Sequence, residues 1–220
     1  KKILLIDGAR QVGKTYIIRY AGGKLFENFI EINMVEDSLG DRLFANTKTV
    51  EDFYLQVSMI AGSKMKSKEN TLIFLDEIQL VKGFEDVVNG LARDFHCDIY
   101  LTGSNSQFLS SDVNTRFRGR GIEIKVFPLL FSEYYAFYGG DRRECFRQYM
   151  MFGGMPYLLQ EKDPMDKAAY LKMIADTVAL KDMEERYHIR NPEAFRAIID
   201  LLASSIGSYV SANKISRTQI

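Results

Sequence analysis

Two short segments of the chain carry the residue types that phosphate chemistry requires. The first is GARQVGKT (residues 8–15), in which glycines precede Lys14 and Thr15. It follows the apolar run ILLI (3–6) and precedes a helical pattern, so it would join a buried strand to a helix N-terminus. Backbone N–H groups exposed by glycine, together with the positive end of a helix, bind phosphate oxygens. The segment predicts a phosphate-binding loop in which Lys14 reaches the β- and γ-phosphates and Thr15 ligates Mg²⁺.

The second segment is TLIFLDE (71–77), an apolar run that ends in two carboxylates. Such a run is typical of a buried parallel strand, and its C-terminal end would lie beside the phosphate loop. There Asp76 would hold Mg²⁺ and Glu77 would orient or deprotonate an attacking water. Each segment alone has a plainer explanation, a glycine-bearing turn or two solvated acids. Together they predict a nucleoside triphosphate site.

The hydrophobic pattern changes its period along the chain, and this indicates two kinds of structure. Apolar runs that predict strands alternate with helical spacing up to Pro128, which favours an α/β fold with a mostly parallel sheet. From Leu129 onward only helical patterns remain. We expect strands at 3–6, 26–33, 71–75, 97–101 and 122–127; helices at 15–21, 50–60 and 84–95, the first of them stopped by Gly22 and Gly23; and later helices at 131–138, 142–152, 166–187 and from 192.

Composition excludes several classes of protein. Hydrophobic residues make up 46%, too many for a disordered chain. Lys and Arg number 29, as do Asp and Glu, so the net charge gives no support for nucleic-acid binding. Cys97 and Cys145 match no disulfide or zinc pattern, which favours a reducing, cytoplasmic setting. No apolar run approaches the roughly 20 residues of a membrane span. Both ends suggest a piece of a longer protein.

Several motifs in a fixed order resemble a known family. They are GARQVGKT, TLIFLDEIQ, YLTGSNSQFL, RFRGRGIEIKVFPLLFSEY and FGGMPYLL. This set resembles the AAA+/archaeal-type P-loop ATPases of the AAA_14 kind, which carry a C-terminal domain of unknown function (DUF4143). The resemblance covers essentially the whole chain. It implies a three-layer P-loop NTPase fold with strand order 5-1-4-3-2. It also implies an ATPase core (1–128), a helical lid (129–191) and the start of a winged-helix-like element (192–220).

The resemblance also assigns roles to residues. Ser104 and Asn105 would stand at the sensor position that holds the attacking water, and Arg120, in a cluster with Arg116 and Arg118, would be an arginine finger. Pro156 would pack near adenine. Arg143 and Arg147 are weak candidates for a sensor on the lid, and Asn33 for a switch partner of Glu77. The expected nucleotide contacts are Gly8, Ala9, Arg10, Gln11, Val12, Gly13, Lys14, Thr15, Tyr16 and Pro156; the expected Mg²⁺ ligands are Thr15 and Asp76; and the expected catalytic residues are Glu77, Lys14, Ser104, Asn105 and Arg120.

Each of these further roles has a plainer alternative. An Asn/Ser turn after a strand would explain Ser104 and Asn105. A solvated basic loop would explain the arginines, and a Gly-Pro helix break would explain Pro156.

The function predicted from these features is Mg²⁺-dependent binding and hydrolysis of ATP, coupled to movement of the lid. The alternative is a STAND-like switch or scaffold that holds nucleotide with negligible turnover. A GTPase would need an Asn-Lys-x-Asp motif, and residues 213–216 lack the acid. We expect ATP and ADP as ligands, a homo-oligomer, an unknown protein partner, and DNA only through the C-terminal region of the full-length protein.

Overall fold

The computed structural model describes most of the chain. The described residues are 2–33, 49–62, 70–78, 84–94, 97–103, 117, 119, 121–177, 183, 188–211, 213 and 215.

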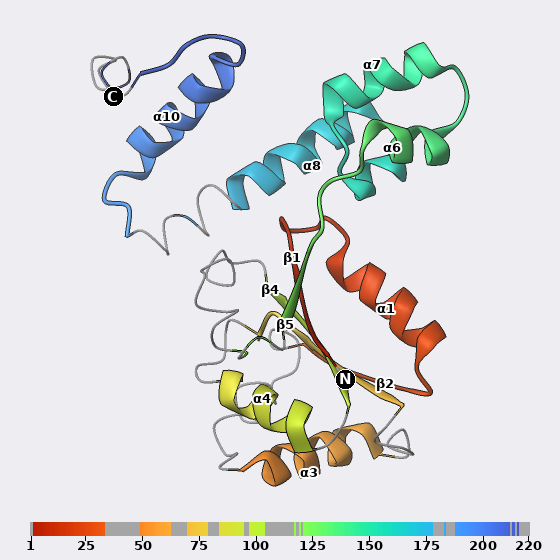
Figure 1. Cartoon of the computed structure of the whole chain (residues 1–220). Helices are drawn as coiled ribbons and strands as arrows, with labels where there is room; N and C mark the ends of the chain where they lie inside the picture. Colours follow the sequence, from red (N-terminus) through yellow and green to blue (C-terminus); the bar gives the residue numbers. More distant parts are fainter. Residues whose placement is uncertain are drawn as a thin grey trace.

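A five-stranded parallel sheet forms the centre of the N-terminal part (Figure 1). Its strands lie in the order β2-β3-β4-β1-β5, which is the predicted order 5-1-4-3-2 counted from the other edge. Because the strands are parallel, the phosphate loop after β1 and the acids at the end of β3 lie at the same edge of the sheet, with β4 between them. The strands are β1 (Ile3–Asp7), β2 (Asn28–Asn33), β3 (Thr71–Asp76), β4 (Asp98–Gly103) and β5 (Gly121–Lys125).

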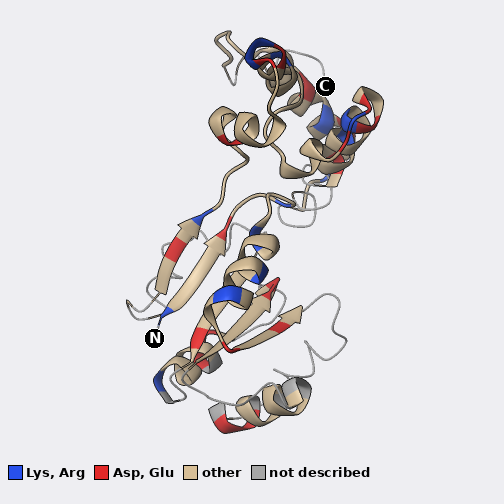
Figure 2. Cartoon of the chain, turned by 90° about the vertical axis from the view of Figure 1, so that its right-hand side faces the viewer, with Lys and Arg blue, Asp and Glu red and all other residues tan. Residues whose placement is uncertain are grey.

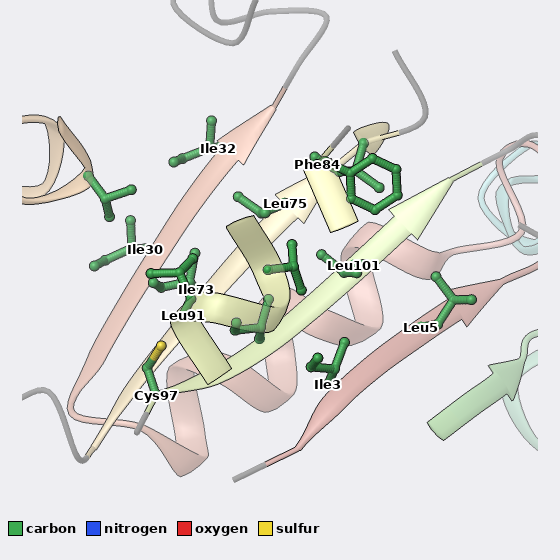
Figure 3. Packing of buried hydrophobic residues seen from close by; sticks show 14 of the residues in the cluster. Ile3, Leu5, Ile30, Ile32, Ile73, Leu75, Phe84, Leu91, Cys97 and Leu101 are labelled. Carbon is green, nitrogen blue, oxygen red and sulfur yellow. The ribbon is translucent and has the colours of Figure 1, made fainter. Parts of the chain in front are cut away.

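Helices cover both faces of this sheet and complete the predicted three layers. Helix α1 (Lys14–Leu25) packs on one face, where its Ile18 joins a cluster with Leu72 and Phe74 of β3. Helices α3 (Val50–Ala61) and α4 (Phe84–Asp94) pack on the other face. Figure 3 shows this second core, in which Phe84 and Leu91 of α4 lie over side chains of four strands. Every residue of β3 is buried, as its continuous apolar run predicted.

The first helix does not end where the sequence predicted. It continues through Gly22 and Gly23 to Leu25, and β2 accordingly begins at Asn28 rather than at residue 26. Gly22 has a packing role, because a Cβ there would lie 2.6 Å from Cδ2 of Phe29. A glycine inside a helix weakens it but lets the helix approach its neighbour closely. The pair of glycines was therefore wrongly interpreted as a stop.

Other boundaries agree with the predictions within a few residues. Helix α3 begins with a capping box, in which Thr49 Oγ1 accepts from the Asp52 N–H at 3.1 Å and Asp52 Oδ2 accepts from the Thr49 N–H at 3.1 Å. Strand β4 extends to Gly103, two residues beyond the predicted end, and β5 begins and ends earlier than predicted.

The C-terminal part is helical, as predicted (Figure 1). Helix α8 begins at Pro164, two residues before the predicted start, because Asp163 caps it by accepting from the Met165 N–H. Residues 178–182 and 184–187 of the predicted long helix lie outside the described residues. The elements are α6 (Phe131–Tyr138), α7 (Arg142–Phe152), the 3₁₀ helix η4 (Pro156–Leu159), α8 (Pro164–Asp176) and α10 (Pro192–Ser204).

Basic and acidic residues are mixed over both parts of the molecule (Figure 2). None of the helices in the described part of the chain combines the length and apolarity needed to cross a bilayer.

The close approach of α1 to the sheet generates a test of the fold. Replacing Gly22 with Ala should lower the free energy of unfolding by about 1–3 kcal/mol, because the added methyl group would be forced against Phe29 and Leu72. The matched control is Gly23→Ala, since a Cβ at Gly23 meets no atom within 4 Å. There the better helix propensity should raise stability by about 0.5–1 kcal/mol. Chemical denaturation measures both, and changes of the same sign would contradict this packing.

Candidate functional site

The loop after β1 has a backbone conformation that presents N–H groups. Gly13, with φ of 100°, is the N-cap of α1 and supplies no side chain to cap it. The first-turn N–H groups of α1 therefore have no side-chain partner at the cap, which is the arrangement of helix N-termini that bind anions. Gly8 is required for another reason, because a Cβ there would lie 2.2 Å from the carbonyl oxygen of Val126.

Lys14 is almost fully buried inside this loop. Its Nζ donates to the carbonyl oxygens of Gly8 at 2.7 Å and Ala9 at 2.8 Å. Burial lowers the pKa of Lys14, while the charges of Glu77, Asp7 and Asp76 partly oppose that shift. The lysine is thus held by two carbonyl oxygens, in the field of the nearby carboxylates. Asp7, which is itself buried, was not predicted as part of the site, although an acid at the end of a buried strand is a usable signal.

A hydrogen-bonded chain joins the two sequence motifs. Thr15 Oγ1 donates to Asp76 Oδ2 at 3.0 Å, across 61 positions of sequence. The other carboxylate oxygen, Asp76 Oδ1, accepts a hydrogen bond from the fully buried Thr102 hydroxyl. Thr102 was missed as a site residue. Its signal is a hydroxyl in the otherwise apolar C-terminal part of β4, next to the strand that carries Asp76.

Glu77 follows in an unusual backbone conformation. Its φ is 55°, in the left-handed region that few residues other than glycine adopt. Its N–H donates to Thr102 Oγ1 at 3.4 Å, so the same hydroxyl contacts both acids of the pair. The turn places Glu77 beside the phosphate loop, where it lines a common pocket.

That pocket has a volume of about 330 Å³ and is formed by both parts of the molecule. The loop, the first turn of α1 and Glu77, directly after β3, supply most of its wall, and α8 with the residue after it supplies the remainder. Ile174 and Thr177 were not predicted, and a helical pattern alone does not show which residues face another domain. The lining residues are Arg10, Gln11, Gly13, Lys14, Thr15, Tyr16, Glu77, Ile174 and Thr177.

Several predicted site residues do not line this pocket. The Val12 side chain is buried, and Gly8 and Ala9 contribute the carbonyl groups that hold Lys14. Pro156 lies next to the loop, since its Cγ would be 3.9 Å from a Cβ built on Gly13. Asn33 pairs with Asp76 in the ladder between β2 and β3.

The remaining predicted residues lie elsewhere or cannot be placed. Arg143 and Arg147 line a different pocket, between α6 and α7. Ser104, Asn105, Arg116, Arg118 and Arg120 lie outside the described residues.

Two family models match the chain. A family model described as an AAA domain matches residues 1–135, which is more than half of the chain. The chain belongs to this AAA domain family. A second model, a domain of unknown function (DUF8612), matches residues 143–220. The association with DUF4143 stays a prediction.

Two curated relatives match the AAA-domain chain along nearly its whole length. One is an uncharacterized protein of Haemophilus influenzae, 30% identical over 98% of this chain and 54% of its own length. The other is an uncharacterized protein of Methanocaldococcus jannaschii, 29% identical over 98% of this chain and 49% of its own length. The chain therefore spans about half the length of these relatives.

The side-chain oxygens of Thr15 and Asp76 suit Mg²⁺ when a phosphate ligand supplies further oxygens. Magnesium is commonly held by one or two protein oxygens, with phosphate oxygens and waters completing the shell. The Thr15 hydroxyl and the Asp76 carboxylate meet that description. No cluster of three or more His, Cys, Asp or Glu that could hold a metal occurs within the described residues.

The position of Thr102 generates a stability test. Thr102→Val should lower the free energy of unfolding by about 1.5–3 kcal/mol, because the Asp76 carboxylate would lose a buried donor. Thr102→Ser keeps the hydroxyl and should recover most of the loss. Denaturation of the three proteins measures this. Equal stability of the Val variant and the wild type would show that the hydrogen bond does not hold Asp76.

The buried lysine generates a test of pH dependence. A pKa lowered in the folded state means that the unfolded chain binds more protons between that value and the ordinary 10.5. Stability therefore rises with pH across that window. The free energy of unfolding of the wild type, minus that of Lys14→Met, should increase as pH approaches 10.5. Lys24→Met, near the other end of α1, controls for the loss of a positive charge. If this difference in the free energy of unfolding stays constant or decreases as pH rises, the burial of Lys14 is contradicted.

Proposed function

We propose that this chain is a Mg²⁺-dependent ATP-binding module that hydrolyses ATP by attack of water on the γ-phosphate. The observation that carries the proposal is the 3.0 Å hydrogen bond between Thr15 and Asp76. It unites the phosphate-loop threonine and the strand-end acid, which are the two groups that hold Mg²⁺ in P-loop NTPases. Membership of the AAA domain family supports ATP as the ligand.

The loop would bind the triphosphate with its backbone and Lys14. The N–H groups at the start of α1 would donate to phosphate oxygens, and Lys14 would exchange the carbonyl oxygens of Gly8 and Ala9 for them. This exchange is favourable because an ammonium–phosphate interaction is charge-assisted. Thr15 and Asp76 would hold Mg²⁺, which neutralises phosphate charge when bound.

Glu77 would orient or deprotonate the attacking water. Its carboxylate borders the same pocket as Lys14 and Thr15, and its backbone is held by Thr102. We retain Ser104 and Asn105 as sensor residues and Arg120 as a finger supplied by a neighbouring copy, on the family resemblance alone. An arginine of this kind accelerates phosphoryl transfer by roughly 10³–10⁵.

The lid would respond to the nucleotide because it forms part of the pocket. Ile174 and Thr177 lie across from the phosphate loop, so a ligand between them would contact both parts of the molecule. Pro156, packed next to Gly13, would carry changes in the loop to the lid or contact adenine. We propose the division into core (1–128), lid (129–191) and a winged-helix-like start (192–220). DNA or protein partners would belong to the longer, full-length protein.

The same shared pocket favours a second function, that of a nucleotide-held switch with negligible turnover. A nucleotide enclosed between loop and lid would hold the two parts in one arrangement without being hydrolysed. Turnover separates the two functions.

The test is Mg²⁺-dependent ATP turnover measured over a series of protein concentrations, together with binding of ATP and ADP. The wild type should turn over repeatedly. Glu77→Gln should bind ATP and lose at least about 10²-fold in rate, as expected for a general base. Lys14→Ala should lose binding. Lys24→Ala, also on α1 but away from the pocket, is the matched control and should behave as wild type.

Each outcome decides between the functions. A rate per chain that rises with protein concentration would indicate a site shared between copies. Tight one-to-one binding without turnover would establish the switch. Absence of binding to ATP and ADP, with or without Mg²⁺, would contradict both.

A further inference from the structure

A second and larger pocket lies on the lid, between α6 and α7. Its volume is about 650 Å³, and it shares no lining residue with the pocket at the phosphate loop. Two phenylalanines and three arginines form its wall. The lining residues are Phe131, Arg142, Arg143, Phe146 and Arg147.

The aromatic part of the wall is held in place by its neighbours. The rings of Phe131 and Phe146 meet edge to face with centroids 5.0 Å apart, and Phe131 also packs on Tyr149 at 5.5 Å. Tyr149 in turn donates its hydroxyl hydrogen to the carbonyl oxygen of Leu129 at 2.9 Å. A wall fixed in this way costs little conformational entropy when a ligand binds. Phe146 nevertheless remains 47% exposed, which leaves its ring open to a partner.

The acidic side chains around the pocket have hydrogen-bond or ion-pair partners, whereas two of the arginines differ in this respect. Asp141 caps α7 by accepting from the Glu144 N–H, and Glu133 accepts from the N–H at the start of α6. Glu144 forms an ion pair with Arg147 at 2.8 Å. Within the described part of the chain, no hydrogen bond or ion pair engages the guanidinium groups of Arg142 and Arg143. The pocket therefore presents two positive charges that an anionic ligand can match.

Exposed apolar side chains also lie on α6 and α7 outside the pocket lining. Met150 is 69% exposed and Met151 is 72% exposed, and Phe137 of α6 is 69% exposed. Arg143, Phe146, Arg147 and Met150 follow helical spacing, so they form one stripe. Arg, Met and aromatic residues are the types enriched in protein interfaces.

This composition favours a protein partner over a nucleic acid. The segment from Phe131 to Phe152 contains three arginines (142, 143 and 147) and three acids (133, 141 and 144), a net charge of zero. Nucleic-acid surfaces carry a clear positive excess. Methionine side chains offer no ring on which bases stack, whereas they adapt readily to an apolar helix face.

We propose that α6 and α7 form a docking site for an acidic amphipathic segment of a partner protein. Apolar side chains of that segment would enter the pocket beside Phe131 and Phe146 and extend over Met150. Its carboxylates would pair with Arg142 and Arg143, as arginine prefers bidentate carboxylate partners. This site is separate from the nucleotide pocket and does not depend on the function proposed for it.

The test is fluorescence anisotropy of a dye-labelled synthetic helical peptide added to the whole chain. The peptide has about 16 residues, roughly 24 Å when helical, with Leu and Phe at i, i+3, i+4 and i+7 and Glu elsewhere. We expect saturable binding near the micromolar range that weakens with salt. The variants Arg142→Gln with Arg143→Gln, and Phe146→Ala, should each weaken it at least about tenfold, which is 1.4 kcal/mol.

Matched controls keep the outcome specific to this site. Arg196→Gln, on α10, should leave the affinity unchanged. Lys14→Ala should also leave it unchanged, which separates this result from failure of the nucleotide site. Absence of saturable binding, equal binding by a peptide with Lys in place of Glu, or tighter binding of a 15-nucleotide oligothymidine would each overturn the proposal.

Discussion

The structure depends most on the hydrogen-bonded chain from Thr15 through Asp76 to Thr102. These residues come from α1, β3 and β4, and their meeting point is the carboxyl edge of a parallel sheet. Buried polar groups are generally hydrogen-bonded, and the strand order that places β4 beside β3 supplies the Thr102 hydroxyl to the Asp76 carboxylate. The parallel strand order and the position of the loop after β1 bring the three residues together at this edge.

Close backbone approach is the second constraint. Gly8 lets the loop pass against the chain that follows β5, and Gly22 lets α1 lie against the sheet. Gly154 does the same after α7, where a Cβ would meet the carbonyl oxygen of Leu129 at 2.1 Å. Side chains at these three positions would separate elements whose relative placement sets the shape of the pocket. Glycine here fixes geometry by its small size.

Much of the fold and part of the site were predictable from the sequence, because local residue patterns determine them. The loop, the Asp76 strand and the ends of α6 and α7 follow from motifs and periodicity, whereas the sheet order was predicted from the family resemblance alone. The end of α1 was not predictable, since a glycine that stops a helix and one that lets it pack look alike in sequence. Likewise, Thr102 and Ile174 belong to the site only through contacts between distant segments. A pattern of period 3.6 shows that a helix has an apolar face, but it does not show what that face meets.

The central claim is that the loop from Gly8 to Thr15 holds a triphosphate and Mg²⁺. Hydrogen–deuterium exchange with a non-hydrolysable ATP analogue and Mg²⁺ tests it most directly, because it reports on the backbone N–H groups themselves. The account predicts slower exchange in the loop and the first turn of α1, with further protection around Asp76 and Glu77 that requires Mg²⁺. Unchanged exchange in the loop at saturating analogue would contradict it.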